Sequence, residues 1–81
     1  MSRQIRVRYY AILREERGCP EESVSTAAAT AGELYESLRR AHGFSLPQSR
    51  LRAAVNDAFV PWTQPLADGD CVVFIPPVSG G

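Results

Sequence analysis

Four segments of the chain carry the hydrophobic patterns of β-strands. Residues 4–11 alternate apolar and polar side chains, and in residues 51–56 Leu51, Ala53 and Val55 alternate with Arg52, Ala54 and Asn56. Asn56-Asp57, a pair typical of tight turns, then leads into residues 58–60. These patterns predict a strand and a hairpin. Residues 71–75 are apolar at every position, which is typical of a strand covered on both faces, so we expect it in the middle of the sheet. Residues 22–26 predict a weak edge strand.

Helical patterns occupy two segments between these strands. Residues 12–17 contain helix formers and predict about one to two turns. Residues 31–42 predict an amphipathic helix, because apolar side chains recur at three- and four-residue spacing. Thr30 and Glu33 form a capping-box sequence, in which each side chain would accept from the other residue's backbone N–H, and Gly43 favours a left-handed cap. The predicted apolar face of this helix comprises Ala31, Leu34, Tyr35, Leu38 and Ala41.

This order of elements predicts an α+β fold in which one face of the sheet is open. One main helix covers only one face of a mixed sheet of about five strands. An apolar patch on the uncovered face of a small protein predicts a binding partner. The alternative is that loops of the chain cover part of this face, with Trp62 as the candidate. By alternation, the residues expected on the open face are Tyr10, Phe59 and either the pair Val73 and Ile75 or the pair Val72 and Phe74.

The length of the chain limits both its domain count and its chemistry. Its 81 residues suffice for one domain, which we assign to residues 1–75, followed by an extended, flexible C-terminal tail at residues 76–81. So short a chain lacks room for an enclosed small-molecule site, which takes on the order of several hundred Å³. The length therefore favours a carrier, an inhibitor or a binding module over a self-contained enzyme.

The charge balance narrows the class of partner. Nine basic and nine acidic residues cancel, so the positive field that a nucleic acid or an anionic membrane attracts is missing. All nine basic residues are arginines, so the chain contains no lysine. No apolar segment approaches the length of a membrane span or resembles a signal peptide. We expect a cytoplasmic protein with no nucleic-acid or membrane partner.

Side chains that could carry metal or redox chemistry are isolated from one another in the sequence. Cys19 and Cys71 form no CxxC pair, and we assign them no role. His42, the only histidine, falls in the last turn of the predicted helix, where a surface or capping position is typical. Phosphate-binding loops and nucleophile motifs are absent from the sequence. We therefore expect no metal site and no permanently bound cofactor.

The remaining candidate for chemistry is the C-terminal carboxylate of Gly81. Joined to an adenylate, this carboxylate becomes an acyl donor, and glycine lets a nucleophile approach the carbonyl without meeting a Cβ. Pro76 and Pro77 would hold the base of the tail extended, and Gly80 would let the C-terminal end pass through a narrow channel. The residues predicted to bind within a partner as this tail are Pro76, Pro77, Val78, Ser79 and Gly80.

Several stretches of the chain together resemble the ubiquitin-like β-grasp sulfur carriers, most closely the small subunits of molybdopterin synthase, the MoaD type. The sequences that carry this resemblance are LRAAVNDAFV from residue 51, the PLADGD turn, the strand VVFIPPV and the final SGG. The resemblance extends over essentially the whole chain and implies a β-grasp fold.

The resemblance also implies a function in molybdenum cofactor biosynthesis. An E1-like adenylyltransferase of the MoeB type would adenylate Gly81 with ATP, and a sulfur donor such as a cysteine desulfurase or rhodanese would convert it to a thiocarboxylate. The tail would then enter the large synthase subunit, the MoaE type, and give sulfur to cyclic pyranopterin monophosphate. The chain would be one subunit of a heteromeric sulfurtransferase whose other catalytic groups lie on the large subunit. By position, the partner interface would include Tyr10, Phe59 and Ile75.

The same fold leaves other functions open. Related carriers supply sulfur for thiamine synthesis or tRNA thiolation, or modify proteins in the manner of ubiquitin, although those tails usually lack the double proline and the thiamine carriers are usually shorter. A different class of function is a β-grasp interaction module whose tail is only a docking peptide. The absence of lysine would exclude lysine-linked chains of this protein but not conjugation to other proteins.

Overall fold

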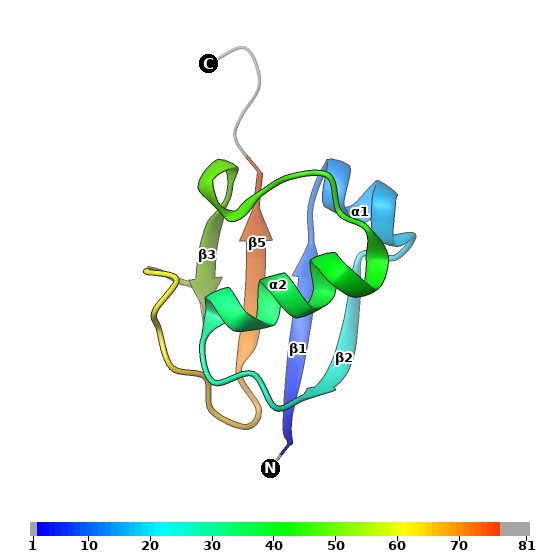
Figure 1. The fold of residues 1–81 in the computed structure, drawn as a ribbon. Helices are drawn as coiled ribbons and strands as arrows, with labels where there is room; N and C mark the ends of the chain where they lie inside the picture. Colours follow the sequence, from blue (N-terminus) through cyan, green and yellow to red (C-terminus); the bar gives the residue numbers. More distant parts are fainter. Residues whose placement is uncertain (1, 77–81) are drawn as a thin grey trace.

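A five-stranded mixed sheet with one long helix across it forms the framework of residues 2–76, the part of the chain that the computed structural model describes (Figure 1). Both predicted helices and all the predicted strands are present. The first strand ends at Tyr9 rather than at residue 11, because the backbone turns at Ala11, where φ is 52°. In chain order the elements are β1 (Arg3–Tyr9), α1 (Ile12–Arg17), β2 (Glu21–Thr26), α2 (Ala31–His42), the 3-10 helix η1 (Gln48–Arg50), β3 (Arg52–Val55), β4 (Ala58–Val60) and β5 (Cys71–Ile75).

The last strand lies in the middle of the sheet, as its unbroken apolar sequence predicted. The strand order is β2-β1-β5-β3-β4, with β5 parallel to β1 and antiparallel to β3. Asn56 and Asp57 both have positive φ, 51° and 71°, which makes the predicted tight turn between β3 and β4. β1 and β5 run in the same direction, so their ends meet at one end of the sheet, away from the N-terminus (Figure 1).

The hydrophobic core lies between the sheet and α2. β5 contributes Val72 and Phe74 to it, and both side chains are fully buried. The Phe74 ring packs edge-on against Tyr35 of α2 with centroids 5.0 Å apart and stacks on Trp62 at 6.0 Å. Aromatic pairs at these separations contribute about 0.5–1.5 kcal/mol each beyond their buried area. The strand that leads to the tail is therefore fixed by hydrogen bonds on both edges and by aromatic packing on one face.

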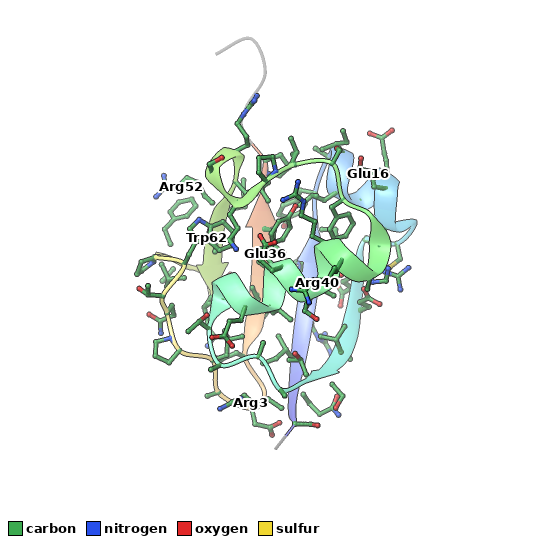
Figure 2. All side chains as sticks on the ribbon, in the orientation of Figure 1. Arg3, Glu16, Glu36, Arg40, Arg52 and Trp62 are labelled. Atoms are coloured by element: carbon green, nitrogen blue, oxygen red, sulfur yellow. The ribbon has the colours of Figure 1, made fainter. Side chains whose placement is uncertain are left out.

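Two expectations about the core are wrong. Trp62 does not cover the open face, because its ring packs beside Tyr35 and Phe74 on the α2 side of the sheet (Figure 2). Ala41 is exposed rather than part of the apolar face of α2. The burial of α2 ends one turn earlier, at Leu38, because the last turn of the helix extends beyond the core residues beneath it.

The start of α2 has the predicted cap with one difference in its partner. Thr30 Oγ1 accepts a hydrogen bond from the Glu33 backbone N–H at 3.2 Å, as expected. The Glu33 carboxylate, however, accepts from the N–H of Ala29 at 3.0 Å rather than from that of Thr30. Thr30 is extended, with φ −131° and ψ 164°, and this backbone presents the preceding N–H to the carboxylate.

Replacing Thr30 with alanine should lower the free energy of unfolding by about 1 kcal/mol, because the Glu33 N–H loses its acceptor. Urea unfolding followed by circular dichroism measures this difference. Ser37→Ala is the matched control, since Ser37 is exposed in the middle of the same helix. Equal destabilisation by the two substitutions would contradict a specific role of the cap.

Candidate partner-binding surface

The end of β5 brings the chain to the surface of the domain. Ile75 and Pro76 are half-buried and follow directly on the buried Phe74. Pro76 is the last residue that the structure describes, so it is the one predicted tail residue with a defined position. The remaining predicted tail residues lie outside the described part of the chain: Pro77, Val78, Ser79, Gly80 and Gly81.

The face of the sheet opposite α2 carries a row of side chains set by the strand register. Val73 of β5 is paired with Arg8 of β1 and with Ala54 of β3, and Ala54 is paired in turn with Phe59 of β4. The sequence left open which alternate residues of β5 point to the open face, and this register decides the question. Val73 and Ile75 belong to the open face. Val72 and Phe74 belong to the core.

The three residues predicted as a partner interface come together on this open face. Tyr10, Phe59 and Ile75 line one shallow hollow of about 200 Å³ with Val73 at its floor. Phe59, on the edge strand β4, is 59% exposed, and Tyr10, which follows β1, is 43% exposed, so both large apolar side chains are open to solvent. Apolar groups gathered in this way favour contact with another molecule, and their role as an interface stays a prediction.

A groove continues from this hollow to the first residue of the tail. It has a volume of about 430 Å³, and its lining includes Phe59, Ile75 and Pro76 together with Arg50 and Arg52. Phe59 and Ile75 line both depressions, so the open face and the start of the tail form one continuous surface.

Two arginines of this surface, Arg8 and Arg52, were not among the residues predicted from the sequence. The Arg52 guanidinium lies over the Phe59 ring, 4.1 Å from its centroid, and that of Arg8 lies 6.0 Å from the ring centroid of Tyr10. The alternation of β3 was the available signal, because it puts Arg52 on the same face as Ala54. The ring on which Arg52 stacks follows only from the pairing of β3 with β4.

A polar cluster of Tyr9, Arg17 and Glu22 connects α1 to strands β1 and β2. Glu22 of β2 accepts two hydrogen bonds from the Arg17 guanidinium, at 2.7 and 2.8 Å, and one from the Tyr9 hydroxyl at 2.6 Å. The hydrogen bonds from Arg17 are the main reason that the pKa of Glu22 lies below its usual range. Burial, together with the Glu22 carboxylate, raises the pKa of Tyr9. Tyr9 therefore stays neutral and donates.

The depressed pKa of Glu22 gives a prediction for the acid stability of the protein. A carboxylate with a lowered folded-state pKa stabilises the fold above its unfolded pKa, about 4.3, and this contribution is lost as the pH falls through the folded value. Glu22→Gln should therefore be less stable than the unsubstituted protein at pH 7, and the difference should shrink below about pH 4. Chemical unfolding at several pH values measures it. Glu15→Gln, at an exposed position on α1, is the control, and a constant difference across the pH range would contradict the account.

The isolated cysteines and the histidine stay without a chemical role. Cys19 and Cys71 are half-buried free thiols. His42 lies beside Phe44, with ring centroids 5.7 Å apart. Within residues 2–76, no cluster of three or more potential metal ligands is present. No helix in this same part of the chain is long and apolar enough to cross a membrane.

Comparison with known proteins identifies the family. The model of the ThiS family matches residues 7–81. The chain belongs to the ThiS family. This ThiS-family chain is 35% identical over 80 residues to the molybdopterin synthase sulfur carrier subunit of Escherichia coli (strain K12), with 95% of the chain and 99% of that protein covered.

Two solved structures resemble this ThiS-family chain closely. One is a putative molybdopterin converting factor, subunit 1, from Pyrococcus furiosus, with 29% identity, a TM-score of 0.78, and 95% of this chain and 100% of that chain covered. The other belongs to a protein–protein complex of subunits 1 and 2 of the molybdopterin-converting factor from Helicobacter pylori, with 28% identity, a TM-score of 0.65, and coverages of 96% and 99%. These likenesses confirm the β-grasp fold and the resemblance to MoaD-type sulfur carriers that the sequence predicted.

Proposed function

We propose that this chain is the sulfur carrier subunit of a molybdopterin synthase and that its reactive group is the carboxylate of Gly81. The observation that carries the proposal is the 35% identity to the E. coli sulfur carrier subunit, which extends over 99% of that protein. The likeness to one subunit of a two-subunit converting factor from Helicobacter pylori supports a large subunit as the partner.

In this mechanism the Gly81 carboxylate is activated before it receives sulfur. A carboxylate oxygen attacks the α-phosphorus of ATP on an E1-like activating enzyme, which forms the acyl-adenylate and releases pyrophosphate. The terminal sulfur of a persulfide on a cysteine desulfurase or rhodanese then attacks the carbonyl carbon and displaces AMP, which leaves an acyl disulfide. A second thiol reduces this disulfide by forming a new disulfide with the donor cysteine, and the Gly81 thiocarboxylate is released. ATP is consumed in the cycle and is not a resident cofactor of this chain.

The thiocarboxylate is delivered by insertion of the tail into the large subunit. There its sulfur passes to cyclic pyranopterin monophosphate, and two such deliveries complete the dithiolene of molybdopterin. Each sulfur is first bonded to the pterin as a thioester of Gly81, and hydrolysis of the bond between the Gly81 carbonyl carbon and this sulfur leaves the sulfur on the pterin and returns Gly81 to its carboxylate form. The remaining catalytic groups belong to the large subunit, so this chain supplies one reactive atom and the segment that delivers it.

The energetics of insertion explain why the domain has a docking surface as well as a tail. Ordering a residue costs roughly 1–2 kcal/mol of backbone entropy, so about five residues cost on the order of 5–10 kcal/mol. Pro76 and Pro77 reduce this cost because each ring fixes one backbone angle. Burial of Tyr10, Phe59 and Ile75 against the large subunit supplies a further favourable contribution, at roughly 25 cal/mol per Å² of apolar surface.

Reconstitution from purified components tests the proposal. The chain, a large synthase subunit, an activating enzyme, ATP and a sulfur donor should together convert cyclic pyranopterin monophosphate to molybdopterin, and omission of ATP should stop the reaction. A chain that forms its thiocarboxylate but supports only thiamine-thiazole synthesis or tRNA thiolation would assign it to another carrier class. A chain that binds the large subunit and never acquires sulfur would be a docking module.

A further inference from the structure

The groove at Pro76 carries positive charge that no side-chain carboxylate of residues 2–76 balances. Its lining includes the guanidinium groups of Arg50 and Arg52, and it contains no carboxylate side chain. Within residues 2–76 neither arginine forms an ion pair, whereas Arg6, Arg8 and Arg17 each have a glutamate partner within 4 Å. Because the whole chain is formally neutral, the positive potential of this groove is a local feature.

The geometry of Arg52 suits it to bind a carboxylate. One face of its planar guanidinium covers the exposed Phe59 ring, at 4.1 Å from the centroid. Stacking uses the face of the group and leaves its N–H donors, which lie in the plane, available for a carboxylate. The ring also holds the guanidinium in place, so less side-chain entropy is lost when a partner binds.

The apolar part of the groove limits the kind of occupant. Leu51, Phe59, Ile75 and Pro76 form a hydrophobic lining beside the two arginines. A nucleic acid or an anionic membrane surface would need a broader positive field than two arginines on a neutral chain provide. A protein segment with acidic and aliphatic side chains matches both the charge and the lining.

We infer that this groove binds an acidic segment of the large synthase subunit, with a carboxylate that pairs with Arg52 and with Arg50. The inference rests on the proposed function and adds the chemistry of the partner's contact to it. A partner that receives the tail has to contact the chain where the tail begins, and Pro76 forms part of the groove wall. The carboxylate at the groove therefore lies at the entrance to the partner's tail channel.

Charge reversal in the groove should weaken the complex. The double variant Arg50→Glu and Arg52→Glu is expected to raise the Kd for the large subunit roughly tenfold or more, because it places like charges opposite one another. The double lysine variant keeps the charges and loses only the stacked guanidinium geometry, so it should weaken binding less than the charge reversal does, and both effects should diminish at high salt. Arg40→Glu on the exposed side of α2 is the matched control and should bind as the unsubstituted chain does (Figure 2).

The absence of lysine permits a sharper test of the occupant. In Arg52→Lys the new side chain is the only lysine of this chain, so a cross-link that a carbodiimide forms from a lysine of this chain can come only from residue 52. In the full complex we expect a cross-link from residue 52 to an aspartate or glutamate of the large subunit. The matched Arg40→Lys variant should give no cross-link from residue 40 to the large subunit.

The outcomes separate the inference from the function on which it rests. A cross-link from residue 52 to the Gly81 carboxylate alone would mean that the chain's own tail occupies the groove, and it would overturn the inference. An intact complex with no cross-link and no effect of charge reversal would overturn it as well, while leaving the proposed function in place. Failure of the unsubstituted chain to bind the large subunit at all would contradict the proposed function itself.

Discussion

Removal of Gly81 is expected to stop sulfur transfer while the domain stays folded and bound to the large subunit. The truncated chain still ends in a glycine, so its carboxylate remains unhindered. Its reach, however, is shorter by about 3.5 Å, the span of one extended residue. A misplacement of about 1 Å can cost roughly 100-fold in rate, so we expect at least this loss in molybdopterin formation.

The truncation leaves folding intact because it removes none of the buried residues, which extend from Ile5 to Phe74 in the part of the chain that the structure describes. Circular dichroism and co-elution with the large subunit check the fold and the complex. Removal of Met1 is the matched truncation at the other end and should leave the rate unchanged. Transfer at the normal rate without Gly81 would show that another group carries the sulfur.

Phe59→Asp is expected to have the second large effect, on complex formation rather than on chemistry. Phe59 is 59% exposed and lines both the open hollow and the groove, so it has the position of an interface hot spot. Loss of such a side chain costs about 2 kcal/mol or more, which is roughly 30-fold in Kd. Isothermal titration with the large subunit measures the change.

The fold should tolerate this substitution because the Phe59 ring contributes little to the core. The new carboxylate lies next to Arg52, which makes a charge at this position acceptable in the free protein. Ala41→Asp, on exposed α2 and on the other side of the sheet, is the control for adding a charge. Equal binding by the two variants would exclude the open face from the interface.

Much of the fold followed from patterns that are local in the sequence. The alternation in β1 and β3, the unbroken apolar β5 and the amphipathic α2 each identify an element without reference to the rest of the chain. The face to which each side chain of β5 points could not be predicted, because a strand that is apolar at every position has no alternation to orient it. Only its pairing with Arg8 and Ala54 shows that Val73 faces away from α2.

The surface was predictable in its apolar part and not in its charged part. Tyr10, Phe59 and Ile75 were expected on one face, and the structure gathers them in one hollow. The alternation of β3 places Arg52 on this face but does not indicate a binding role, since an arginine in a sequence is usually a solvated side chain, and Arg50 lies outside the strand pattern. A binding role for Arg50 and Arg52 depends on the groove. This groove forms only when β3 is paired in the sheet and β5 ends beside β3.

The position of Trp62 in the core could likewise not be predicted from the local sequence. It follows a short edge strand and precedes a long loop, and nothing in its neighbouring sequence selects a face of the sheet. The rings of Tyr35 and Phe74 provide the apolar contact that draws it to the α2 side. The open face is consequently left without this cover.

The mass of the C-terminal peptide shows whether Gly81 carries sulfur. Residues 53–81 contain no lysine or arginine, so trypsin releases them as one peptide. In protein purified from its native host during active molybdenum cofactor synthesis, this peptide should include a species heavier by the difference between sulfur and oxygen, with the added mass at Gly81. A peptide found only in its carboxylate form under these conditions would contradict the account.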